Sequence, residues 1–158
     1  MEAKSLQPAR GDWMRYWMNV PAQRIRELAH HLSERCQVAD LEIPQSGLAL
    51  VPLADAAMGE IYYLGEIPVA KAHVRLTNPQ GSTAEGAAIV MDDRTSLIRA
   101  LAILDAVTAA VWPGHEDAMK LLHEGKRAVE ATAADRKKLL AATRVDFSLL
   151  ATQEDDDE

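Results

Sequence analysis

The sequence predicts one α+β domain, in which an antiparallel sheet of four to five strands packs against N-terminal and C-terminal helices. Apolar residues at helical spacing occur near both ends of the chain, and the alternation typical of strands occupies its middle. Short turns, and not helices, separate the strand segments, which favours antiparallel pairing. The chain has 158 residues, the usual length of one domain. We place the domain at 12–150, after a flexible lead-in at 1–11 and before a disordered acidic tail at 151–158.

Two amphipathic helices are expected to open the domain. Asp12 is a good N-cap for a helix over about 12–19, and Pro21 fits the first turn of a second helix over about 21–36. The second helix has an apolar stripe with helical spacing, formed by Ile25, Leu28, Leu32 and Cys36. The position of the single cysteine on this stripe indicates a buried structural thiol.

Five strand segments are expected between residues 38 and 91. The first two cover 38–43 and 48–53, and Pro44–Gly47 has the composition of a turn between them. The remaining three follow a loop at about 54–59, and they cover 60–64, 69–77 and 87–91. Because no helical pattern separates these segments, the sequence predicts a sheet built from hairpins.

Two further helices are expected after the strands. Asp92 and Asp93 offer caps for an apolar helix over about 94–112, which a Pro-Gly pair at 113–114 ends. A charged, mostly helical stretch follows over about 115–143.

The charge distribution excludes some classes of partner. The net charge is −7, but the last five residues are all acidic, and without them 19 acids face 17 Lys and Arg, which leaves −2. A nearly neutral body lacks the basic surface that general nucleic-acid binding requires. No apolar stretch approaches the ~20 residues of a membrane span. The first residues do not resemble a signal peptide, so we expect a cytoplasmic protein that binds neither nucleic acid nor membrane.

A short basic row is the best local candidate for a binding site. Side chains alternate along a strand, so Lys71, His73 and Arg75 share one face of the fourth strand segment. Three donors on one face could bind an anion or an acidic partner surface. The alternative is an ordinary solvated sheet face. The five histidines have no metal-ligand spacing, and we expect no metal site.

Aromatic residues are few, and three of them lie near the two ends of the chain. Trp13 and Trp17 fall on the first expected helix, and Phe147 lies in the segment that begins at Arg144. Aromatic anchors of this kind are typical of protein interfaces. We therefore consider Trp13, Trp17, Arg144 and Phe147 as contacts for a partner, with packing in the core as the alternative.

Several short pieces of sequence, in order over residues 12–150, resemble one known family. They are Asp12-Trp13-Met14, Ser46-Gly47-Leu48, Leu64-Gly65-Glu66, the strand segment 69–76, Leu104-Asp105-Ala106 and Arg144-Val145-Asp146-Phe147. Together they are similar to the PhnG family, the small subunit of the bacterial carbon–phosphorus lyase core complex. Lys71 stands where the family tends to have Arg, which keeps the charge but not the fork of donors.

The resemblance implies a role in an assembly. It implies partners of the PhnH, PhnI and PhnJ types, two copies of each subunit, and a PhnL-type ATPase. This complex activates alkylphosphonates by displacing adenine from ATP to give a ribose 1-phosphonate 5-triphosphate, before the carbon–phosphorus bond is cleaved. ATP is then a substrate of the complex, and we expect this chain to bind no cofactor and not to be catalytic by itself. The residues alone also leave open a stand-alone anion-binding domain or a homo-oligomeric scaffold.

Overall fold

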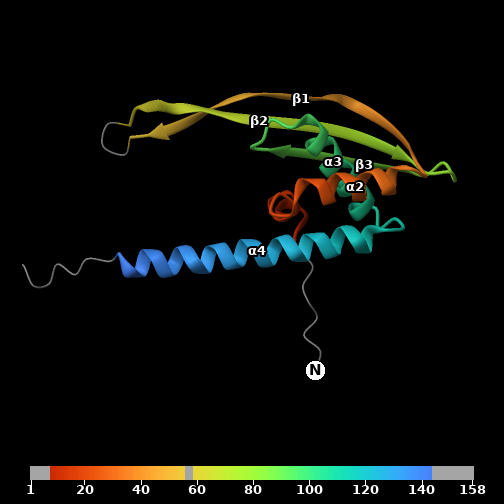
Figure 1. Cartoon of the computed structure of the whole chain (residues 1–158). Helices are drawn as coiled ribbons and strands as arrows, with labels where there is room; N and C mark the ends of the chain where they lie inside the picture. The colour runs from red at the N-terminus through yellow and green to blue at the C-terminus, as the bar shows by residue number, and fades with distance from the viewer. Residues whose placement is uncertain (1–7, 56–58, 144–158) are drawn as a thin grey trace, which may run out of the picture.

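The computed structural model describes residues 8–55 and 59–143. Its elements form an α+β arrangement in which a three-stranded sheet follows two N-terminal helices and precedes two C-terminal ones (Figure 1). In chain order they are the 3-10 turn η1 (Arg10–Asp12), α1 (Trp13–Trp17), α2 (Ala22–Ser33), β1 (Gln37–Ala54), β2 (Ile61–Thr77), β3 (Thr83–Val90), α3 (Thr95–Ala109) and α4 (His115–Ala142). The four predicted helices are present, each with ends close to the predicted ones.

The predicted number of strands is wrong, because neighbouring predicted strands are joined into longer ones. The sheet has three antiparallel strands in the order β1-β2-β3. The predicted strands 38–43 and 48–53 are both parts of β1, and 60–64 and 69–77 are both parts of β2. The turn predicted at Pro44–Gly47 lies inside β1, where shifts in pairing with β2 accommodate the irregular backbone. A proline is tolerated there because β1 is an edge strand with one partner.

One face of the sheet packs against α3. The side chains of β2 on this face are buried, and two of the four are alanines; they are Ala70, Ala72, Val74 and Leu76. Gly86 of β3 makes the approach closer still, because a Cβ atom at this position would lie 2.1 Å from the carbonyl oxygen of Ala102 in α3. Small residues on the sheet therefore set the short distance between the two layers.

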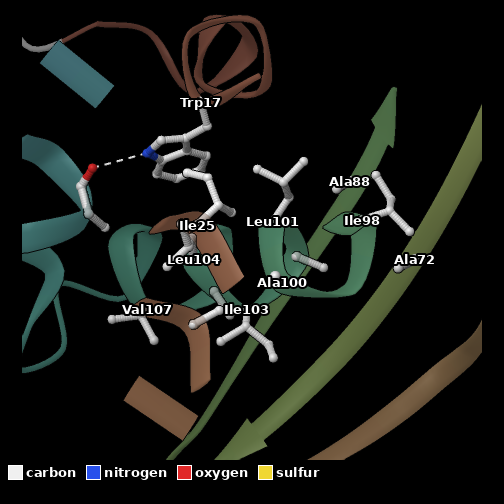
Figure 2. Packing of buried hydrophobic residues seen from close by; sticks show 14 of the residues in the cluster. Trp17, Ile25, Ala72, Ala88, Ile98, Ala100, Leu101, Ile103, Leu104 and Val107 are labelled. Carbon is white, nitrogen blue, oxygen red and sulfur yellow. Dashed lines mark hydrogen bonds between the residues drawn. The ribbon is translucent and has the colours of Figure 1, made fainter. Parts of the chain in front are cut away.

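The core is centred on α3, which is buried on nearly all sides by the sheet, α2 and α4 (Figure 2). Trp17 of α1 lies within this core, and its indole N–H donates a hydrogen bond of 3.0 Å to the carbonyl oxygen of Ala118 in α4. Gly125 of α4 lets the backbone of Tyr16 approach, since a Cβ atom there would lie 1.9 Å from the Tyr16 carbonyl oxygen. These contacts fix α4 to the N-terminal helices.

Two segments extend beyond this core. β3 pairs with β2 only over Ala70–Thr77, so the rest of the β1–β2 hairpin continues as a two-stranded projection. We call residues 47–55 and 59–69 the arm. The other extension is the last part of α4, where every described residue from 131 to 143 is exposed. In the view of Figure 1, the arm and this end of α4 project to the same side.

Candidate functional site

The predicted basic row is present on the face of the sheet that points away from α3. Lys71, His73 and Arg75 are at least partly exposed, and they alternate with buried residues of β2, as the sequence predicted. Opposite charges from the neighbouring strands accompany them. Glu42 of β1 is paired with His73 in the strand register, and Glu85 of β3 is paired with Arg75.

These two glutamates form ion pairs along the whole row. The Lys71 ammonium lies 3.0 Å from a Glu42 carboxylate oxygen. Glu85 accepts two hydrogen bonds from the Arg75 guanidinium, of 2.8 and 2.6 Å, and its other oxygen lies 3.5 Å from His73 Nε2. The hydrogen bond from Lys71 lowers the pKa of Glu42, and the hydrogen bonds from Arg75 lower the pKa of Glu85. The row is therefore a ladder of cross-strand ion pairs, in which two carboxylates balance Lys71 and Arg75.

These two carboxylates were not predictable from the sequence. Glu42 and Glu85 lie 29 positions before Lys71 and 10 positions after Arg75 in the chain, and only the pairing of the strands brings them to the row. An anion that binds here must compete with Glu42 and Glu85 for the same donors.

A second charged group, also missed from sequence, lies between the helical and sheet layers. Asp105 of α3 is 3% exposed and accepts hydrogen bonds of 2.9 and 2.6 Å from the Arg10 guanidinium. The backbone N–H of Ala87 in β3 donates a third, at 3.1 Å. The hydrogen bonds to Asp105 raise the pKa of Arg10. The carboxylate thus joins α3, β3 and the residues before α1, and its position suits a structural role.

Trp13 and Trp17, which were predicted as candidate contacts for a partner, pack in the hydrophobic core. Trp13 is 9% exposed and Trp17 is fully buried, and their rings pack edge to face with centroids 5.7 Å apart. The Trp13 indole N–H donates a 3.0 Å hydrogen bond to the carbonyl oxygen of Pro8. Core packing is the alternative that the sequence left open for both residues. Arg144 and Phe147 lie outside the described residues, so their contact with a partner stays a prediction.

One hollow in the described part of the chain is lined by the single cysteine, but its thiol is not activated. A cavity of about 400 Å³ lies between the end of α2, the β2–β3 turn and the loop before α4, and Cys36 and Trp112 are among its lining residues. Cys36 is partly buried, and burial raises the pKa of its thiol, so that the thiolate is scarce at neutral pH. Within residues 8–55 and 59–143, no three His, Cys, Asp or Glu side chains gather closely enough to hold a metal ion.

None of the helices in the described part of the chain combines the length and apolar character needed to cross a membrane.

Two comparisons with known proteins point to the same family. The model of a family described as "Phosphonate metabolism protein PhnG" matches residues 8–152. A protein of Rhizobium meliloti (strain 1021), named alpha-D-ribose 1-methylphosphonate 5-triphosphate synthase subunit PhnG, is 32% identical over 126 residues. The aligned region covers 78% of this chain and 76% of the relative. Since the match spans the sheet, the core helices and the ion-pair ladder alike, the chain belongs to the PhnG family.

Proposed function

We propose that this chain is a non-catalytic but required subunit of a complex that activates alkylphosphonates. The observation that carries the proposal is the similarity to a named synthase subunit over most of both chains. The name of that relative is that of a synthase of alpha-D-ribose 1-methylphosphonate 5-triphosphate, of which the relative is one subunit.

The proposed reaction is the displacement of adenine from ATP by an alkylphosphonate. The products are free adenine and a ribose 1-phosphonate 5-triphosphate, on which later cleavage of the carbon–phosphorus bond depends. ATP is a substrate of the complex in this proposal, and no cofactor is assigned to this chain. The proposed partners are subunits of the PhnH, PhnI and PhnJ types with a PhnL-type ATPase, two copies of this chain per complex, in the cytoplasm.

The chemistry of the described residues supports a structural role for this subunit. The best cluster of donors, Lys71, His73 and Arg75, is already bonded to Glu42 and Glu85. Burial raises the pKa of the Cys36 thiol, which makes the nucleophilic thiolate scarcer still. These groups are better suited to stabilising the sheet than to binding a triphosphate or attacking a carbon atom.

Co-expression with the partner subunits tests the proposal. We expect the tagged chain to purify with PhnH-, PhnI- and PhnJ-type subunits of the same genome as one particle in size-exclusion chromatography. With the PhnL-type ATPase present, ATP and methylphosphonate should yield free adenine, and omission of this chain should abolish the yield. A chain that elutes alone as a monomer in the presence of the other subunits contradicts the proposal.

Measurements on the purified chain, alone and with the other subunits, distinguish the two other functions. If the isolated chain bound ATP or methylphosphonate in calorimetry, and lost this binding in a Lys71→Ala, Arg75→Ala variant, it would be a stand-alone anion-binding domain. A stable homo-oligomer that ignores both the ligands and the other subunits would be a scaffold.

A further inference from the structure

The arm exposes an unusual amount of apolar surface. Seven of its large apolar side chains are 40% exposed or more, and they are Leu48, Leu50, Leu53, Ile61, Tyr62, Tyr63 and Leu64. Monomeric soluble proteins rarely leave large apolar patches in water, and such patches mark interaction sites.

Much of this surface continues the core face of the sheet. Pro68 alternates with the buried Ala70 and Ala72, so it lies on the same side of β2, and it pairs with Leu48 of β1. Leu50 shares this side with Leu48, and Tyr63 shares it through its pairing with Pro52. Nearer the domain this face is covered by α3, whereas along the arm the same face is exposed. One layer of a two-layer arrangement is therefore absent there.

The edges of the arm are poorly suited to adding another strand. Pro52 and Pro68 each remove a backbone donor from strands that have one partner in the arm. The pairing also shifts between Val51 and Pro52, which bends the ladder. Both features are ways in which proteins prevent edge-to-edge pairing. The arm is thus built to offer side chains on its faces and not hydrogen bonds along its edges.

The charge of the arm indicates what kind of surface it fits. Residues 47–69 of the sequence contain three acids, Asp55, Glu60 and Glu66, and no Lys, Arg or His. Two arms packed against each other would bring Glu60 and Glu66 of both copies together, and residues 47–69 supply no Lys, Arg or His to balance them, so a symmetric pair of arms is disfavoured. A different chain with an apolar groove and a basic rim complements both the side chains and the charge.

We propose that the arm is the element by which this subunit docks into another subunit of the complex. The receiving surface is an apolar groove that takes Leu48, Leu50 and Tyr63. It also offers Lys or Arg side chains to Glu60 and to Glu66, which pairs with Leu50 on this same face. This inference rests on the proposed function, because it requires that the chain work in an assembly of different subunits.

The experiment compares exposed apolar residues inside and outside the arm. Leu48→Thr with Tyr63→Thr removes apolar contact area while keeping residues that favour strands. Ile89→Thr is the matched control, since Ile89 of β3 is 67% exposed and Leu48 is 68% exposed. Binding of each purified variant to the immobilised assembly of the PhnH-, PhnI- and PhnJ-type subunits is measured, and circular dichroism confirms that each variant is folded.

We expect the double variant to bind at least about 100-fold more weakly, since a few buried anchors dominate most interfaces. The Ile89→Thr control should change affinity by no more than about 2-fold, as near-neutral positions do. Glu60→Lys with Glu66→Lys should slow association and remove part of its dependence on salt, whereas Glu27→Lys on α2 should not.

The outcomes separate the two proposals. A folded Leu48→Thr, Tyr63→Thr variant that binds as tightly as the wild type overturns the docking role of the arm and leaves the proposed function standing. If the wild-type chain forms homo-oligomers and the double variant does not, the docking role of the arm is also overturned. The arm would then bind a second copy of this chain and not a different subunit. A wild-type chain that does not bind the assembly at all overturns both.

Discussion

Substitution of Gly86 by Ala tests whether the close approach between β3 and α3 holds the domain together. The added Cβ atom would lie 2.1 Å from the Ala102 carbonyl oxygen and 2.4 Å from the Ala106 backbone nitrogen. Both atoms belong to the backbone of α3, which cannot rotate away as a side chain does. The helix must therefore shift against a sheet face and helices that bury it on nearly all sides.

The expected cost follows from two opposing effects. Forcing an extra carbon into a packed core costs about 1–3 kcal/mol, and more when backbone must move. Replacing Gly in a strand recovers about 0.5–1 kcal/mol of chain entropy. We therefore expect a net loss of about 2 kcal/mol, which corresponds to a Tm lower by about 4–8 °C for a domain of this size.

Gly47→Ala is the matched control, because Gly47 also lies in a strand and a Cβ atom there would meet nothing within 4 Å. Urea unfolding followed by circular dichroism gives both free energies of unfolding. Gly47→Ala should be neutral or slightly stabilising. A Gly86→Ala midpoint equal to that of Gly47→Ala would refute the packing argument.

Two further predictions concern buried and paired carboxylates. Arg10→Ala should lower the free energy of unfolding by about 1–3 kcal/mol, because among the described residues the buried Asp105 carboxylate then keeps the Ala87 N–H as its one hydrogen-bond donor. Arg15→Ala on the exposed side of α1 should have little effect in the same urea titration. Hydrogen bonds from Arg94 lower the pKa of Asp92 from 3.8 to about 2, so this carboxylate contributes stability above about pH 4 that is lost as the pH falls towards 2. Urea midpoints measured from about pH 5 to about pH 2 should therefore fall less steeply for Asp92→Asn than for the wild type, and equal slopes would contradict this assignment.

The helices were predictable because their signals are local. Apolar spacing and the Pro-Gly pair at 113–114 depend on neighbouring residues, and they mark α2, α3 and α4 correctly to within a few positions. The predicted cap of α3 is different in detail, since Arg94 is the N-cap residue and Asp92 accepts the N–H of Arg94 in the turn before it.

The strands and the charged groups were harder to predict because they depend on long-range pairing. Pro44 and Gly47 favour a turn, but β1 is an edge strand, and its pairing with β2 keeps this segment extended. The alternation that puts Lys71 and Arg75 on one face was readable from the sequence. Their partners Glu42 and Glu85 were not, because the register between strands decides which acids lie opposite.

The exposed end of α4 sets how far the chain extends from the domain without contributing to the core. Gly125 is the last buried residue of α4, and the helical rise of ~1.5 Å per residue carries Thr143, 18 positions later, about 27 Å further along. The described residues after position 130 are exposed, so this stretch is a rod held in shape by its own hydrogen bonds. A change in the length of the rod would therefore move Thr143 relative to the domain while leaving every core contact in place.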